Sequence, residues 1–119
     1  MLNQSGIKTE KATTPKSILW APEHAIAFSC VVGQSKLMLA GTPLTGDLTN
    51  RNADFTAATT STGSNAIGLL LHDVDTSSAK QNGTILVAGV VDMNKLDSSV
   101  VSLITADVKA ALPNIIFVK

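Results

Sequence analysis

The chain has 119 residues, of which 45% are hydrophobic, so it is long enough to bury one compact core and too short for two full domains. Nine acidic side chains balance nine basic ones and Arg51 is the only arginine, which argues against electrostatic binding of nucleic acid or an anionic membrane. Aromatic residues make up 3% of the chain, too few for stacking platforms.

Two further features bear on where the protein is used. The sequence contains no run that approaches the roughly 20 apolar residues of a transmembrane helix, and its first 16 residues lack the apolar centre of a signal peptide. Cys30 is the only cysteine, so no internal disulfide can form. We therefore expect a protein that is made and used inside a cell.

The N-terminal 20 residues differ in character from the rest. Residues 1–17 are polar and have no helical or strand periodicity, which predicts a mobile arm. Ile18, Leu19 and Trp20 then form an isolated apolar group before Pro22. This group is either a first strand or plug over the core, or a docking segment that lies on a partner. We expect an arm over residues 1–20 and a β-rich domain over residues 21–119.

The first half of that domain shows strand patterns and a long polar stretch. Alternating apolar residues predict a half-buried strand over residues 26–32, in which Cys30 faces the same side as Ile26 and Phe28 and is an inert, buried thiol. A second apolar run is expected to end at Gly41, because Pro43 does not fit a central ladder. Residues 45–65 predict a surface loop anchored by Phe55.

The second half predicts two strands, one helix and a terminal strand. A buried strand is expected at residues 67–71, paired antiparallel with another at residues 84–93, with Asn82 and Gly83 forming the turn before the latter. Helical spacing then predicts one amphipathic helix that begins at Asp97 or Ser98 and stops at Pro113; its apolar residues are Val100, Leu103, Ile104, Val108, Ala111 and Leu112. Residues 115–118 predict a final strand, which gives a mostly β fold with one short helix (α+β).

One cluster invites a chemical interpretation. His72, Asp73 and Asp75 follow the apolar run at residues 67–71 and are either a metal or acid–base site or the solvated end of a buried strand. On a strand, His72 faces the side opposite to both carboxylates, and the sequence Asp-Val-Asp-Thr-Ser-Ser is typical of turns with local hydrogen bonds. We favour the strand end, and predict no catalytic residue, no metal site and no cofactor.

Several spaced blocks resemble one family. The segments "AGTPLTGDLTNR", "NAIGLLLHDVD", "NGTILVAGVVDMNKLD" and "AALPNIIFVK", spread over residues 24–119, are similar to head decoration or head fibre proteins of tailed bacteriophages, and more distantly to the small head decoration protein of lambdoid phages. The order of a polar loop, two strands, an acidic linker, a helix and a terminal strand carries the likeness.

The resemblance implies a compact β-tulip or barrel-like domain that binds the outside of the expanded icosahedral head as a homotrimer at threefold sites. It would cement neighbouring major capsid proteins, bind no nucleic acid or membrane, catalyse no reaction, and be made in the host cytoplasm. The arm would dock on the shell through Ile18, Leu19 and Trp20.

Two alternatives stay open. One is a head fibre module that binds a host surface or glycan, and the other is a small metal-dependent hydrolase that uses His72 and the nearby carboxylates.

Overall fold

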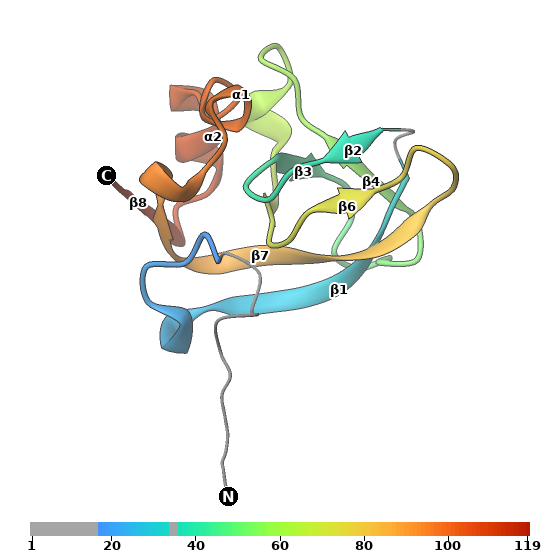
Figure 1. The fold of residues 1–119 in the computed structure, drawn as a ribbon, viewed down its shortest axis with the longest axis horizontal. Coiled ribbons are helices and arrows are strands. Elements are labelled where there is room, and N and C mark those ends of the chain that lie inside the picture. The colour runs from blue at the N-terminus through green and yellow to red at the C-terminus, as the bar shows by residue number, and fades with distance from the viewer. Residues whose placement is uncertain (1–16, 34–35) are drawn as a thin grey trace, which may run out of the picture.

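The computed structural model describes residues 17–33 and 36–119, which form a mostly β domain with two short α-helices (Figure 1). This confirms the predicted fold class. The strands are β1 Ile26–Val32, β2 Leu37–Met38, β3 Pro43–Thr45, β4 Asp54–Ala57, β5 Gly68–Leu70, β6 Val74–Asp75, β7 Gln81–Asp92 and β8 Ile115–Val118. The helices are α1 Ser98–Val101 and α2 Ala106–Ala111, with 3₁₀ turns η1 Pro22–His24, η2 Gly63–Asn65 and η3 Met93–Lys95.

Five strands close on themselves as a small barrel. The sheet runs in the order β1-β4-β3-β5-β7, and β7 also pairs with β1, so each of these strands has a neighbour on both sides. β1 and β7 are antiparallel, as are β5 and β7, whose pairing was predicted. Closure removes the open edges that would otherwise recruit other chains.

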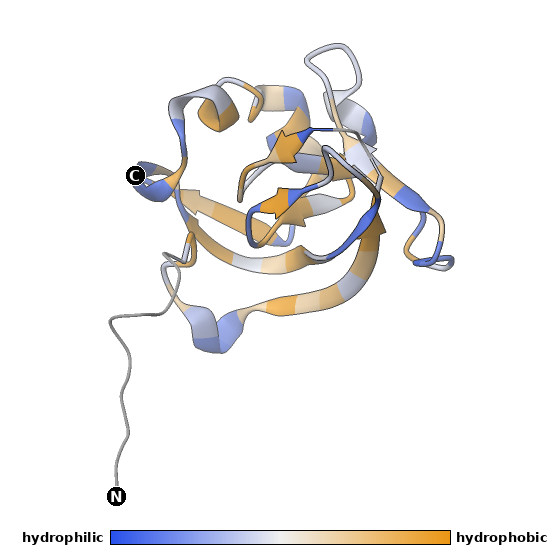
Figure 2. Cartoon of the chain, turned by 45° about the vertical axis from the view of Figure 1, so that its right-hand side comes forward, coloured by the Kyte–Doolittle hydropathy of each residue, from blue (hydrophilic) through white to orange (hydrophobic). Residues whose placement is uncertain are grey.

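The barrel encloses one of two apolar cores. Its interior is filled by buried side chains from both the barrel and the separate two-stranded sheet β2–β6, and the strands are accordingly largely hydrophobic in Figure 2. These side chains are Cys30, Val32, Met38, Leu44, Phe55, Leu70, Val74 and Ile85. Phe55 is completely buried, so its predicted anchoring role is confirmed.

The second core lies between the C-terminal half of β7 and the helices. β7 changes neighbours at Gly89, whose φ of 149° favours glycine, and from there it pairs with β8 in parallel. β5 separates the two cores: Leu69 packs in the second and Leu70 in the barrel. Because both faces of β5 are buried, its sequence is continuously apolar rather than alternating.

The prediction of a single helix was wrong in its extent. Asp97 caps α1 by accepting a hydrogen bond from the Ser99 N–H, and Thr105 caps α2 by accepting one from the Val108 N–H at 3.4 Å. Thr105 has an extended backbone, so the chain leaves the helix there and starts again. The buried residues keep their four-residue spacing, which is why the sequence suggested one continuous helix; they are Val100, Ile104, Val108 and Leu112.

The turn predicted at Asn82–Gly83 was also wrong. Both residues lie inside β7, where Gly83 is the ladder partner of Cys30. A Cβ on Gly83 would come within 2.8 Å of Val32 Cγ2, so this glycine serves close packing rather than a turn. The reversal occurs earlier, at residues 76–80, where Asp75 accepts hydrogen bonds from the backbone N–H and hydroxyl of Ser77.

The region from Gly41 to residue 65 is more ordered than predicted. Pro43 opens β3, a central strand of the sheet, and Ala58 donates its N–H to the Pro43 carbonyl. Proline is tolerated there because it is the first residue of the strand. β4 lies within the expected loop and joins β1 to β3.

The burial of β1 differs from the predicted alternation. Cys30 and Val32 are buried, whereas Ile26 and Phe28 are 54% and 41% exposed. β4 reaches only Val31 and Val32, so the first half of β1 pairs with β7 alone and extends past the barrel core.

Candidate functional site: the surface around Trp20

The segment 18–20 runs antiparallel to β7. Leu19 forms a bridge with Val91, the Trp20 N–H donates to the Val90 carbonyl at 2.8 Å, and the Asp92 N–H donates to the Ile18 carbonyl at 2.8 Å. Ile18 and Leu19 are buried in the second core, whereas Trp20 is 63% exposed. Of the three residues expected to dock on a partner, Trp20 alone presents its side chain to solvent.

The strand register aligns Trp20 with two other apolar residues. Because Leu19 lies opposite Val91, Trp20 lies opposite Val90, and Val90 is in turn the ladder partner of Ile116 in β8. Residues directly opposite one another share a face of the sheet. Trp20, Val90 and Ile116 therefore form a row across three neighbouring segments, which we call the Trp20 surface.

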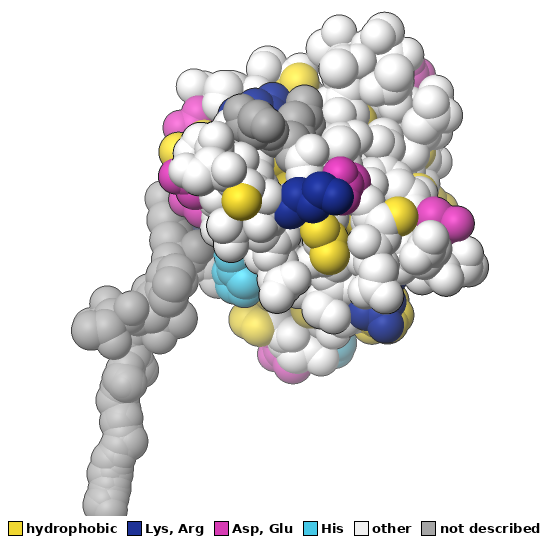
Figure 3. Space-filling model, turned by 90° about the vertical axis from the view of Figure 1, so that its right-hand side faces the viewer, with side chains coloured by type: hydrophobic (Ala, Val, Ile, Leu, Met, Phe, Trp, Pro, Cys, Tyr) yellow, Lys and Arg dark blue, Asp and Glu magenta, His cyan; other side chains and the backbone are white. Residues whose placement is uncertain are grey.

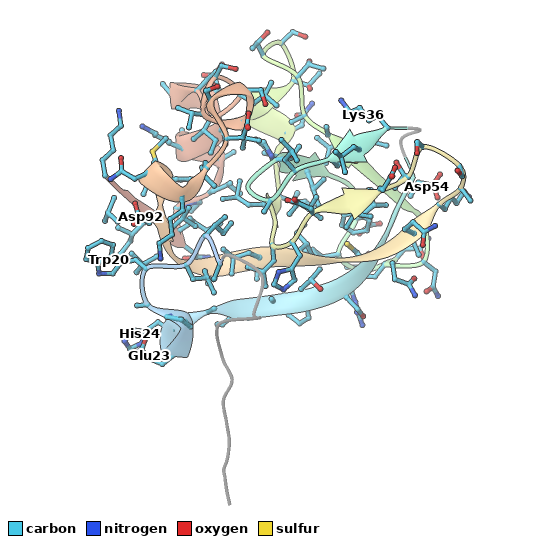
Figure 4. All side chains as sticks on the ribbon, in the orientation of Figure 1. Trp20, Glu23, His24, Lys36, Asp54 and Asp92 are labelled. Atoms are coloured by element: carbon cyan, nitrogen blue, oxygen red, sulfur yellow. The ribbon has the colours of Figure 1, made fainter. Side chains whose placement is uncertain are left out.

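The Trp20 surface is accessible. Ile116 is 59% exposed and Val90 is half-buried. Figure 4 shows Trp20 at one end of the domain, the end that also carries Asp92 and the exposed turn with Glu23 and His24. Among the described strands, β8 pairs only with β7, so it also forms an edge of the sheet beside this row.

The His72 cluster behaves as the end of a strand. The Asp73 carboxylate accepts a hydrogen bond from the Ala40 N–H at 2.7 Å, and Asp75 starts the turn described above. The hydroxyl and then the backbone N–H of Ser77 lower the pKa of the Asp75 carboxyl below its usual value. The two carboxylates thus accept hydrogen bonds from different backbone segments, which agrees with the favoured interpretation of this cluster as the end of a strand.

His72 lines a pocket of about 490 Å³ together with Asp73, Lys95 and Asp97. Asp97 in turn caps α1 and Lys95 donates to the Leu19 carbonyl at 3.5 Å. Within residues 17–33 and 36–119, no three His, Cys, Asp or Glu side chains are grouped closely enough to bind a metal ion. Of the candidate hydrolase residues, His72 and Asp73 thus share this pocket and Asp75 does not line it, and they form no ligand set in this part of the chain.

Cys30 lies inside the barrel and is 4% exposed. Burial raises the pKa of its thiol, and the positive charge of Arg51 offsets only part of that increase. A thiol with a raised pKa is mostly protonated at neutral pH and is a poor nucleophile. This agrees with the predicted inert role.

Sequence reasoning missed Val90 and Ile116. The Ile115–Ile116 pair offered a signal, because adjacent residues of a strand face opposite sides and one of the two must point away from the core. Which of the two isoleucines lies on the same face as Trp20 depends on strand pairing with residues about 70 and 100 positions away from Trp20. No local sequence pattern encodes that pairing.

No family model matches the chain, and no curated protein is significantly similar to it. None of the helices in the described part of the chain has the length and apolar character needed to cross a membrane.

Proposed function

We propose that this protein is a bacteriophage capsid decoration protein: a non-enzymatic, structural domain that binds the outside of the expanded head and cements neighbouring major capsid proteins. The family resemblance of the sequence suggests this role. The observation that carries it furthest is the Trp20 surface, an exposed apolar row next to the point where residues 1–16 join the domain.

Covering the exposed indole ring of Trp20 by a partner would remove apolar surface from water, which is favourable. The large, partly apolar indole ring is among the side chains most enriched at the energetic centre of protein interfaces. The protein has no net charge. Figure 3 shows the side of the domain turned away from Trp20, where acidic and basic side chains are scattered rather than gathered into one charged patch. Short-range apolar contact is therefore the more suitable basis for attachment than long-range attraction.

The repeating lattice of a head suits a small contact area of this kind. Three copies acting as a homotrimer at a threefold site would engage the shell together, so that modest affinity per copy gives stable attachment. The closed barrel supplies a rigid body with few open strand edges for such an assembly.

The test is co-sedimentation of the purified full chain with empty, expanded heads of the parent phage. We expect saturable binding at a copy number that matches the threefold lattice sites. Absence of binding to correctly expanded heads would contradict the proposal.

Variants locate the contact. We expect Trp20→Ala to weaken binding about 30-fold, since loss of an interface hot spot costs about 2 kcal/mol or more. Leu37→Ala is the matched control, because Leu37 is 57% exposed but lies in the separate β2–β6 sheet. Equal binding by both variants would remove the Trp20 surface from the proposal even if the protein still binds heads.

A second candidate, a head fibre module that binds a host glycan, is favoured by one specific observation: a polar pocket around Arg51. Binding to glycans without binding to heads would support it over decoration.

A further inference from the structure

A pocket of about 560 Å³ lies across the outer side of the barrel, where β1, the loop at residues 46–53 and the start of β7 meet. Most of the residues that line it are polar, and Leu48, Cys30 and Val31 complete the lining; the polar residues are Ser29, Thr49, Asn50, Arg51, Asn52 and Asn82. The loop is fixed to the barrel, because the Val31 N–H donates to the Arg51 carbonyl at 3.3 Å. The pocket is therefore formed by anchored backbone.

Arg51 is held in place but its charge is not neutralised. Its Nη1 donates to the carbonyl of Ser29 at 2.9 Å and to the Ser29 hydroxyl at 3.1 Å, and the guanidinium lies 5.7 Å from the centre of the Phe28 ring. A guanidinium carries five N–H donors, so most remain available. In the described ranges, no carboxylate pairs with Arg51, whereas Asp54 pairs with Lys80 at 3.0 Å.

The three asparagines add unused hydrogen-bonding groups. Within the part of the chain that the structure describes, the carboxamides of Asn50, Asn52 and Asn82 make no hydrogen bond. The backbones of two of them are nevertheless fixed: the Ala53 N–H donates to the Asn50 carbonyl at 3.2 Å, and Asn82 lies in the β1–β7 ladder. Each carboxamide offers both a donor and an acceptor.

We infer that this pocket binds a saccharide that bears a carboxylate, such as a uronic or sialic acid unit. The free edge of the Arg51 guanidinium matches a planar carboxylate, which it can hold through two parallel hydrogen bonds. The carboxamides match sugar hydroxyls, which also donate and accept. Leu48 supplies apolar surface for the C–H face of a sugar ring.

A carboxylate fits better than a phosphate. Phosphate groups carry up to two negative charges and are usually bound by several cations or by a glycine-rich loop at a helix start. Arg51 is the only cationic side chain that lines this pocket. This assignment does not depend on capsid binding, and the experiment below uses no heads.

The test is an NMR titration of the ¹⁵N-labelled full chain with tri-galacturonate and sialyllactose, against maltotriose as a neutral trisaccharide. We expect the acidic sugars to shift the amide signals of residues 48–52 and 82 at concentrations at least about tenfold lower than maltotriose, because the ion pair with Arg51 adds 1.4 kcal/mol or more.

Arg51→Gln should weaken binding of the acidic sugars about tenfold and abolish the preference over maltotriose. Lys109→Gln is the control, since it removes one positive charge from α2, outside the pocket. The amide spectrum shows whether each variant is folded, and Asn82→Ala tests the pocket while leaving Arg51 in place. We expect the asparagine variant to bind both sugar types more weakly.

Three results would overturn the inference. The first is no shift at the pocket with any saccharide, and the second is equal affinity for acidic and neutral sugars. The third is a pocket that responds to hexaglutamate and not to sugars, which would assign Arg51 to an acidic segment of a protein partner.

Discussion

At the scale of single residues, two phenylalanines on neighbouring strands differ in how deeply they are buried. Phe55 is completely buried in the barrel core, whereas Phe28 lies on the exposed half of β1 beneath Arg51. A phenylalanine in the core contributes burial and packing, and its removal leaves a cavity. An exposed ring contributes little more than its contact with the guanidinium.

We therefore expect Phe55→Ala to lower the free energy of unfolding by about 3–5 kcal/mol. Phe28→Ala, the matched control, should cost about 1 kcal/mol or less, because its cation–π contact is solvent-exposed. Urea denaturation followed by far-UV circular dichroism measures both. Similar losses for the two variants would contradict the assignment of the core.

Three exposed aspartates give the protein a defined response to acid. Asp47, Asp75 and Asp97 each accept hydrogen bonds from the hydroxyl and backbone N–H of the residue two positions later, and the hydroxyl is the larger influence. These bonds favour the charged carboxylate and lower its pKa in the folded state.

A lowered folded-state pKa means that the unfolded chain binds protons first as the pH falls. The stabilisation is therefore complete above the unfolded pKa of about 3.9 and is lost as the pH falls through the lower folded pKa. We expect urea midpoints to decrease between neutral pH and strongly acidic pH. Replacing all three aspartates with asparagine should make that decrease shallower, and an unchanged pH dependence would contradict the predicted linkage.

At the scale of elements, the interrupted helix depends on one side chain. Thr105 separates α1 from α2 by capping the first turn of α2. We expect Thr105→Ala to lower the free energy of unfolding by about 1 kcal/mol. Thr105→Ser should retain most of the stabilisation that the cap provides, because serine offers the same hydroxyl acceptor. Denaturant unfolding compares them, and a serine variant as unstable as the alanine variant would show that the methyl group matters instead.

Elements with strong local patterns were predicted from the sequence, and elements that exist only through pairing with neighbouring strands were not. β5 and β8 are continuous apolar runs, so length and composition identified them. β4 was missed because its only large apolar residue is Phe55, and the strand exists through pairing with β1 and β3. Asn82–Gly83 carried a strong turn signal that the β1–β7 ladder overrides.

For the candidate sites, too, the sequence identified a conspicuous residue but not the contacts with distant segments that form the site. Trp20 is conspicuous in the sequence as the only tryptophan, within a short apolar group. Its exposure, and the burial of Ile18 and Leu19 beside it, follow from the bridge to Val91, a contact 72 positions away along the chain. The Arg51 pocket was not predicted for the same reason: it joins three segments that are distant in sequence.

At the scale of the whole molecule, the two cores share β5 and β7, and the second core includes Ile18 and Leu19. Residues 1–16, most of the predicted arm, lie outside the described residues. The compact unit thus extends to Ile18, before the expected domain start at residue 21.

This extension predicts different effects for two truncations. Removing residues 1–20 deletes Ile18 and Leu19 from the core, and each buried aliphatic side chain contributes about 2–5 kcal/mol. We expect that variant to be strongly destabilised or unfolded, and a chain beginning at Ser17 to keep the urea midpoint of the full chain. Equal stability of the two truncations would contradict the place of Ile18 and Leu19 in the second core.

We proposed that Trp20 contacts the capsid, and the fluorescence of this residue reports on that contact because the chain contains no other tryptophan. Biosynthetic replacement of Trp20 by 5-hydroxytryptophan allows its emission to be excited apart from that of the shell. We expect acrylamide to quench the fluorescence of the free protein strongly, since Trp20 is 63% exposed, and we expect the quenching to fall sharply when the protein is bound to expanded heads. A head-bound protein whose Trp20 remains as readily quenched as in solution would contradict the proposed contact.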